Sequence, residues 1–382
     1  MKTYNWYSSL SRRQRLLLFG TILIMAVLII TGVATDKSSS RIHDRKFTVE
    51  NSIKEIAPAL NVTGKALAGE LGIPSPKKGA GKKPLSSLGV SPEKLDEVVE
   101  HLLSHKGKTL KYYLFAALFI GGLVFMVKLG RPESSEPGKG KNRYPAGPYI
   151  LFLFVSLAAA GFYLGKSPNP MEGVVKVFKS MAGLYPDPWM KFTAFLFFIA
   201  MAVIGNKLIC GWACPFGALQ ELIYSLPLLR KSKSRIKISF IITNTIRTGL
   251  FILMILILFG IPGGRKGFVL YHNMNPFNLF DFKFESLWVA LTVIISVLVS
   301  FIVYRPFCRI ICPFGLFSWF AERISIFRIR IDKEKCTECG KCIKACPLGA
   351  AEGIVSGRKF PEDCFSCARC LDKCPVDAIK FS

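Results

Sequence analysis

All 12 cysteines of this 382-residue chain fall in closely spaced groups, and none stands alone. Two groups near the C-terminus follow the pattern Cys-x2-Cys-x2-Cys-x3-Cys-Pro, and two earlier groups follow the pattern Cys-x3-Cys-Pro. A random scatter of buried thiols would leave some cysteines outside any pattern. Because short spacings bring several thiolates to one metal centre, the cysteines constrain the chain to fold around metal sites.

The two C-terminal groups predict a pair of [4Fe–4S] clusters. Their spacing is that of bacterial two-cluster ferredoxins, in which the fourth cysteine of each run binds the other cluster. The first cluster is predicted on Cys336, Cys339, Cys342 and Cys374, and the second on Cys364, Cys367, Cys370 and Cys346. Zinc is the alternative, because Cys-x2-Cys pairs also bind it. Disulfides are a weaker alternative, because they require an oxidising compartment.

The two earlier groups read Cys210-Gly-Trp-Ala-Cys214-Pro-Phe-Gly and Cys308-Arg-Ile-Ile-Cys312-Pro-Phe-Gly. Thiols four residues apart at a helix end share one face, so each pair offers two ligands. Together the pairs offer four, the number that an iron–sulfur cluster needs. We predict a further cluster held jointly by these four cysteines. A redox-active dithiol, another metal such as copper and a purely structural role remain open.

Apolar segments dominate the rest of the chain, which is 51% hydrophobic. We predict membrane-spanning helices, about six in number, over residues 16–34, 112–127, 149–164, 189–205, 239–261 and 287–304. The first and last approach the roughly 20 residues that a helix needs to cross a bilayer. The net charge of +26 has the sign that nucleic-acid binding requires. A mean hydropathy of +0.37 argues against nucleic acid and for membrane lipid as the partner.

The basic residues indicate an orientation in the membrane. Lysines and arginines gather in residues 1–15, in residues 128–147 and in the loop after the fourth predicted span. Because short cytoplasmic loops carry an excess of Lys and Arg, this distribution places both termini in the cytoplasm. We therefore expect a multi-pass protein of the cytoplasmic membrane with its C-terminal cysteines on the reducing side.

Two polar residues of the fifth predicted span, Asn244 and Arg247, fall at membrane depth. Ionisable groups at such depth tend to be functional, which makes both residues candidate contacts of a quinone. Snorkelling of Arg247 to the membrane surface is the alternative. No histidine lies in a predicted span, so no haem b with paired axial histidines is expected.

The Cys-x3-Cys-Pro groups belong to a longer internal repeat. In each copy a span is followed by an outside loop with an Asn-Pro pair, a second span and the cysteines; the loops carry Asn169-Pro170-Met171 and Asn275-Pro276-Phe277. Both copies begin on the cytoplasmic side, so they form parallel two-helix repeats. Duplication of a half-site would bring two ligands from each copy to one shared centre.

These features predict a mainly α protein, in which a polytopic helical membrane domain precedes a C-terminal α+β two-cluster ferredoxin domain. The predicted parts are an N-terminal membrane anchor, a small extracytoplasmic helical segment, a second span with a basic loop, a membrane domain with both Cys-x3-Cys-Pro groups and the ferredoxin domain. Their respective ranges are 1–34, 35–109, 110–147, 148–325 and 326–382.

The segment Cys210–Glu221, the second Cys-x3-Cys-Pro group and the tandem C-terminal groups resemble the NapH/NosR-type membrane-bound ferredoxins. The resemblance covers about residues 148–382. It implies transfer of electrons between the quinone pool and a periplasmic reductase system, with the ferredoxin domain in the cytoplasm. The chain departs from the family in lacking a recognisable periplasmic flavin domain and in carrying two extra N-terminal spans.

The function expected from this resemblance is electron relay between the quinone pool, or a cytoplasmic donor, and a partner redox protein such as a periplasmic reductase or a cytochrome. The chain would serve as the electron-transfer subunit of an oxidoreductase complex of the quinol dehydrogenase type. Two alternatives are an accessory ferredoxin for copper handling or for assembly of a respiratory enzyme, and a redox-sensing membrane regulator.

Overall fold

A computed structural model describes much of the chain from residue 47 onward. The described residues are 47–60, 62, 64–73, 83–106, 110–129, 146–165, 169–184, 189–226, 236–261, 268–282, 284, 286–358 and 361–382. They divide into two compact units, each treated separately below. The larger unit holds residues 111–175 and 195–382, and the smaller unit holds residues 176–194 and the described residues up to 110. The predicted span 16–34 lies outside the described residues.

The smaller unit contains a helical module with its own apolar core. Its elements are α2 (Ile53–Ala59), α3 (Gly64–Glu70), the 3-10 turn η2 (Leu85–Leu88) and α4 (Pro92–Lys106). Ile56, Leu60, Leu67 and Leu85 are fully buried in this core. The Ser91 hydroxyl accepts a hydrogen bond from the Lys94 amide (3.3 Å) and so caps the start of α4.

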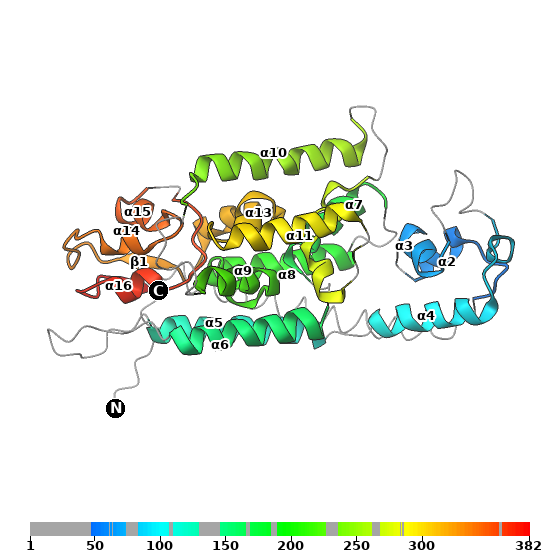
Figure 1. The fold of residues 1–382 in the computed structure, drawn as a ribbon, viewed down its shortest axis with the longest axis horizontal. Helices are drawn as coiled ribbons and strands as arrows, with labels where there is room; N and C mark the ends of the chain where they lie inside the picture. Colours follow the sequence, from blue (N-terminus) through cyan, green and yellow to red (C-terminus); the bar gives the residue numbers. More distant parts are fainter. Residues whose placement is uncertain are drawn as a thin grey trace. The chain divides into compact units, whose positions relative to one another are not determined.

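The larger unit begins with a set of apolar helices (Figure 1). Its first elements are α5 (Leu110–Leu129), α6 (Ala146–Val155), the π-helical turn η3 (Ser156–Tyr163), α7 (Pro170–Met181), α8 (Trp189–Gly205), the π-helical turn η4 (Ile209–Ala213) and α9 (Pro215–Ser225). There follow α10 (Phe240–Phe259), η6 (Leu270–His272), η7 (Pro276–Asp281), α11 (Leu287–Ser300), α12 (Pro306–Ile310), α13 (Pro313–Ala321) and η8 (Glu322–Ile324). Helices α7 and α8 contribute residues to both units.

The five predicted spans within the described residues are helical, although they differ in length and hydropathy. Helix α8 has the predicted bounds, and α10 starts at Phe240, one residue after the predicted start. Helix α11 ends at Ser300; the chain then turns at Arg305, which has a left-handed conformation (φ 49°), and Pro306 begins α12. Among the described helices, α10 alone has both the length and the apolar composition to cross a membrane, and four others are apolar but shorter. The prediction of six spans is not confirmed.

The C-terminal part of the larger unit has the α+β composition predicted for it. Strand β1 (Ile329–Ile331) pairs antiparallel with β2 (Ile379–Phe381), with Ile329 opposite Phe381. Three short helices lie between the strands in sequence: α14 (Lys341–Ala345), α15 (Ala350–Val355) and α16 (Arg369–Lys373). The Phe327 and Phe381 rings stack beneath this sheet at a centroid distance of 6.3 Å.

The chain entering this C-terminal domain also completes the end of α8. The amides of Ile326 and Phe327 donate to the carbonyls of Val203 (2.8 Å) and Ile204 (2.9 Å). Carbonyls in the last turn of a helix have no partner within the helix, so a neighbouring segment that supplies amide donors stabilises the helix end. This pairing holds the start of the C-terminal α+β domain against the last turn of α8.

Candidate iron–sulfur sites

Three cavities in the described part of the chain are each lined by four cysteines. The helix cavity is lined by Cys210, Cys214, Cys308 and Cys312; ferredoxin cavity one by Cys336, Cys339, Cys342 and Cys374; and ferredoxin cavity two by Cys346, Cys364, Cys367 and Cys370. The structure thus gathers all twelve cysteines into the three groups that the spacing predicts. No three Cys, His, Asp or Glu side chains of the described residues converge closely enough to hold a single metal ion.

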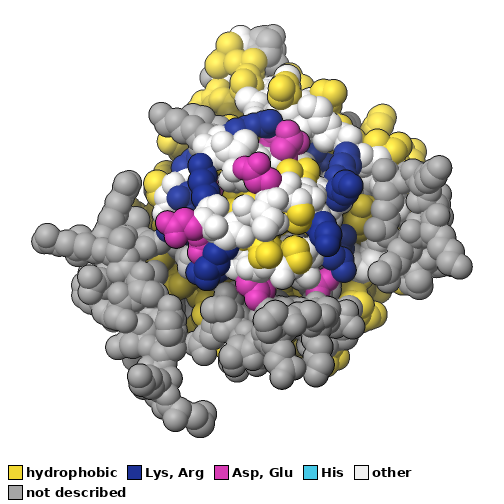
Figure 2. All heavy atoms as spheres, turned by 90° about the vertical axis from the view of Figure 1, so that its left-hand side faces the viewer, with side chains coloured by type: hydrophobic (Ala, Val, Ile, Leu, Met, Phe, Trp, Pro, Cys, Tyr) yellow, Lys and Arg dark blue, Asp and Glu magenta, His cyan; other side chains and the backbone are white. Residues whose placement is uncertain are grey.

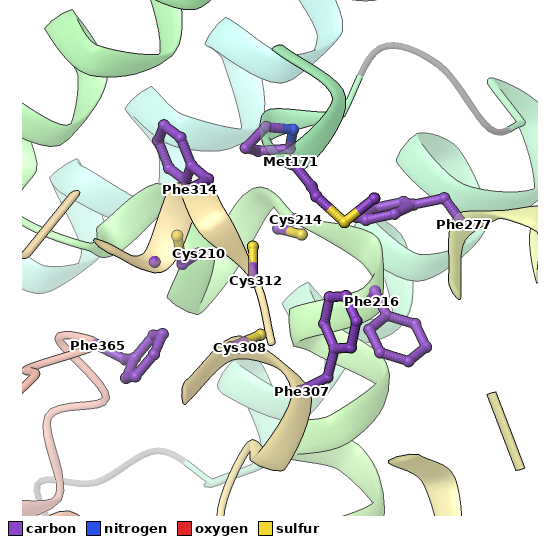
Figure 3. A pocket seen from close by; sticks show the side chains of 12 residues that line it. Met171, Cys210, Cys214, Phe216, Phe277, Phe307, Cys308, Cys312, Phe314 and Phe365 are labelled. Atoms are coloured by element: carbon purple, nitrogen blue, oxygen red, sulfur yellow. The ribbon is translucent and has the colours of Figure 1, made fainter. Parts of the chain in front are cut away.

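The helix cavity lies between the two Cys-x3-Cys-Pro groups (Figure 3). The space between the side chains is about 360 Å³, open solvent included, and nearly all of the wall is apolar. The wall outside the cysteines consists of Pro170, Met171, Phe216, Phe277, Phe307, Phe314, Gly315 and Phe365. Four soft thiol donors around a dry, apolar space match the donor set of an iron–sulfur cluster.

The repeated Cys-Pro sequence explains how two of the four thiols are placed. A residue before proline is driven into an extended conformation, and Cys214 (ψ 119°) and Cys312 (ψ 116°) are both extended. Each therefore stands as the N-cap of a helix, with Pro215 or Pro313 at the first helical position. The free amides and the positive end of the dipole of α9 and α13 favour a thiolate at that position.

The loops with the Asn-Pro pairs contribute wall residues to the helix cavity, which the sequence did not predict. Asn169 caps α7 by accepting a hydrogen bond from the Glu172 amide (2.7 Å). Asn275 accepts a hydrogen bond from the Phe277 amide (3.2 Å) at the start of η7. Met171 and Phe277, which follow the two caps, then line the cavity. The signal available in the sequence was the matching place of Asn-Pro in both copies of the repeat.

The glycine of each Pro-Phe-Gly sequence permits close packing around the cysteines. A Cβ on Gly217 would overlap the Cys210 carbonyl oxygen, and one on Gly315 would lie 2.5 Å from the Cys308 carbonyl oxygen. At Gly211, between Cys210 and Cys214, a Cβ would overlap the carbonyl oxygen of Phe365. The ferredoxin chain therefore approaches the helix cavity closely only because residue 211 lacks a side chain.

Because the Phe365 carbonyl lies so close to Gly211, a methyl group added at residue 211 should destabilise the protein, whereas one added at an open site should not. Gly211→Ala is expected to lower the free energy of unfolding of the full chain by about 1–3 kcal/mol, the cost of overpacking. Gly249→Ala in α10 is the control, because a Cβ there meets no atom within 4 Å. Thermal unfolding followed by absorbance should separate the two variants. Equal stability of both would contradict the close contact at Gly211.

The two ferredoxin cavities differ in exposure. Ferredoxin cavity two leaves about 370 Å³ unfilled and includes buried Phe365 and Ala368 in its wall. Ferredoxin cavity one leaves about 890 Å³ unfilled, and its Cys339 is exposed. Figure 2 shows the end of the molecule that carries the C-terminal domain, where Lys and Arg side chains lie mainly along two sides and Asp and Glu side chains are interspersed with them. The exposed Cys339 makes cavity one the more accessible of the two ferredoxin cavities.

A buried ion cluster fastens ferredoxin cavity two to the helical region. The Asp363 carboxylate pairs with the Lys207 ammonium and, at 3.2 Å, with the Arg247 guanidinium. All three side chains are at most 1% exposed. Burial alone would raise the pKa of the Asp363 carboxyl, but Lys207 and Arg247 hold that pKa below its usual value. Asp363 immediately precedes Cys364, so these contacts position a cysteine of cavity two.

Asn244 and Arg247, the two residues predicted to contact a quinone, have partners within the protein in this same cluster. Arg247 Nη2 donates to Asn244 Oδ1 (2.6 Å), and both residues lie in the first half of α10. The structure places Arg247 against the C-terminal domain, through Asp363, and its guanidinium is fully buried. Arg247 therefore does not snorkel to a membrane surface. Contact of Asn244 and Arg247 with a quinone stays a prediction.

A second buried ion cluster links α9 to the ferredoxin domain through Glu221, Arg305 and Arg369. The Glu221 carboxylate of α9 pairs with Arg305 (3.0 Å) and with Arg369 of the ferredoxin domain. Arg305 also donates to the carbonyls of Cys210 and Gly211, the latter at 3.0 Å. Buried charges are stable only when paired and hydrogen-bonded, so these contacts hold the ferredoxin domain in one position against the cysteine-bearing turn.

The cavities and the two-cluster ferredoxin fold define an iron–sulfur electron-transfer protein. A 4Fe-4S binding domain model matches residues 188–237, and 4Fe-4S dicluster domain models match residues 306–350 and 329–381. An uncharacterized protein of Methanocaldococcus jannaschii is 30% identical over 52% of this chain and 71% of its own length. The chain belongs to the NapH/NosR-type family of membrane-bound 4Fe–4S ferredoxins.

Two relatives with more informative names align over a smaller share of their length. The ferredoxin-type protein NapH of Haemophilus influenzae is 28% identical over 47% of this chain and 61% of the relative. The methylamine utilization ferredoxin-type protein MauN of Methylobacillus flagellatus is 26% identical over 38% of this chain and 50% of the relative. No solved structure matches the chain.

Proposed function

We propose that the chain is a multi-pass membrane protein that relays electrons through three iron–sulfur clusters. The observation that carries this proposal is the grouping of the cysteines into three cavities of four. The residues that would hold the clusters are the four cysteines of each cavity. A bound cluster supplies reversible one-electron chemistry, and its potential is tuned by the surrounding hydrogen bonds and solvent exposure.

The protein's own residues prepare each cavity for this task. The aromatic wall of the helix cavity excludes water, while the N-termini of α7, α9 and α13 begin at its edge and favour negative charge there. Gln220 Nε2 lies 3.2 Å from Cys308 Sγ, and the Ala378 amide donates to Cys374 Sγ (3.3 Å). Hydrogen bonds of this kind stabilise the thiolate form and orient the ligand.

Apolar side chains on the outer faces of the long helices support insertion in a bilayer. On α10 and α11, Ile241, Leu287 and Trp288 are between 68% and 74% exposed. Large apolar side chains that are this exposed support contact with a membrane or a partner. We propose that lipid covers these faces, that both termini lie in the cytoplasm and that residues 35–109 form an extracytoplasmic segment.

The proposed donor is the quinone pool and the proposed acceptor is a periplasmic reductase or a cytochrome, with a cytoplasmic donor as the alternative entry point. The names of the relatives, a ferredoxin-type protein NapH and a methylamine utilization ferredoxin-type protein MauN, support electron transfer with partner redox proteins. Asn244 and Arg247 remain candidate quinone contacts in this proposal.

Potentiometric EPR with iron and sulfide quantification on the purified full chain tests the proposal. We expect about 12 irons per chain and three signals, since each [4Fe–4S] cluster contributes four irons. About eight irons, or copper in place of iron at the helix cavity, would contradict the three-cluster relay, and copper would favour the metal-handling alternative. Cluster potentials all far below that of quinone would rule out quinol as the donor.

A further inference from the structure

The ring of Phe365 lies between two of the cysteine cavities. It lines the helix cavity together with Cys210 and Cys308, and it lines ferredoxin cavity two together with Cys364 and Cys367. The side chain is 1% exposed. Figure 3 shows it entering from the C-terminal chain, on the side of the helix cavity opposite Phe277. Phe365 does not line ferredoxin cavity one.

The backbone on both sides of Phe365 is fastened to the turn that carries Cys210. The Asn206 amide group donates to the Cys364 carbonyl (3.1 Å), and the Trp212 indole N–H donates to the Ser366 carbonyl (3.1 Å). Gly211 leaves room for the Phe365 carbonyl itself. The loop therefore contacts the helical region at three consecutive residues, which leaves the Phe365 backbone little freedom to shift.

Two cationic side chains lie over the Phe365 ring. The Arg305 guanidinium lies 5.2 Å and the Lys207 ammonium 5.3 Å from the ring centroid, both within the range of cation–π attraction. The same two cations pair with Glu221 and Asp363, respectively. The two buried ion clusters thus meet at Phe365, and both position its ring between the cavities.

We propose that Phe365 is a positioning residue that couples the helix cavity to ferredoxin cavity two, so that cavity two is proximal to the membrane centre and cavity one is distal. This inference rests on the proposed three-cluster relay. One electron that crosses at Phe365 oxidises the centre on one side by one electron and reduces the other by one, with no bond made or broken. Cavity one, with exposed Cys339, then exchanges electrons with a soluble partner.

The first test measures how fast the centres equilibrate. The full chain in lipid nanodiscs receives electrons from a photoreduced deazaflavin, and freeze-quench EPR follows each signal. Phe365→Leu should slow equilibration between the helix-cavity centre and the ferredoxin centres about tenfold or more, because a smaller side chain loses packing contacts across the gap. Iron content and midpoint potentials should stay at wild-type values, and Phe365→Tyr should keep the wild-type rate.

The matched control is Phe381→Leu. Phe381 is also buried (4% exposed) in the ferredoxin domain but lines none of the three cavities. In the Phe381→Leu variant, electrons should equilibrate between the centres at the wild-type rate. A wild-type rate in Phe365→Leu, or equal slowing in both leucine variants, would overturn the inference. A wild-type protein with about eight irons and no third signal would instead remove the three-cluster relay itself.

A second measurement does not depend on how Phe365 variants fold. A fast-relaxing paramagnetic centre broadens the EPR signal of a centre close to it. The signal of the helix-cavity centre therefore reports which of the two ferredoxin centres lies closer to the helix cavity. Cys339→Ser, which disables cavity one, should leave this relaxation enhancement in place, whereas Cys367→Ser, which disables cavity two, should abolish it. The reverse result would make cavity one proximal and overturn the order proposed here.

Discussion

Replacing Cys210 and Cys214 with serine is expected to lower the iron content of the purified chain from about 12 to about eight irons. Replacing Cys308 and Cys312 should give the same loss, and replacing all four should remove no further iron. The reason is geometric: the two pairs line a single cavity, so a centre held by both cannot survive the loss of either. Iron and sulfide quantification with EPR of the reduced protein measures the effect.

The comparison variant for this experiment is Cys339→Ser, which should remove the signal of ferredoxin cavity one and leave that of the helix cavity. Losses that add between the two pairs would mean that each Cys-x3-Cys-Pro group binds its own metal. Unchanged iron in both double variants would leave a redox dithiol or a structural role for these cysteines.

The second large effect is expected at the buried ion cluster. Lys207→Met leaves the Asp363 carboxylate in a fully buried position with Arg247 as its remaining cation. Loss of one partner from a buried ion pair typically costs about 3–5 kcal/mol, because the other charge stays desolvated. We expect a lower thermal midpoint for loss of cluster absorbance and faster tryptic release of the ferredoxin domain.

Lys380→Met is the matched control within the same unit. Lys380 pairs with Asp332 at 3.6 Å, and both side chains are partly exposed, at 37% and 26%. Such surface pairs contribute about 1 kcal/mol or less, since water screens both charges. If the two methionine variants lost equal stability, the Asp363 cluster would not be what holds the ferredoxin domain in place.

Local spacing patterns were sufficient to predict how the cysteines group. Cysteines two residues apart reach one centre almost regardless of the surrounding fold, and the known exchange of the fourth cysteine between runs completed each predicted group of four. The structure lines each ferredoxin cavity with those four cysteines, and their binding of clusters stays a prediction. Hydrophobic composition likewise located helix α8 to the residue and α10 to within one residue at its start. The end of α11 was predicted four residues too late, because apolar residues continue past Ser300 while the backbone already turns toward Arg305.

What the sequence alone determined is therefore the 4Fe–4S character of the C-terminal part and the grouping of the cysteines, because both follow from short spacings. Only the tertiary structure decided the partner of Arg247 and the place of Phe365. Asp363 lies 116 residues from Arg247 and 156 from Lys207 along the chain. Pairing over such separations leaves no periodic trace in a sequence, and folding alone brings these charges and this ring together between the cavities.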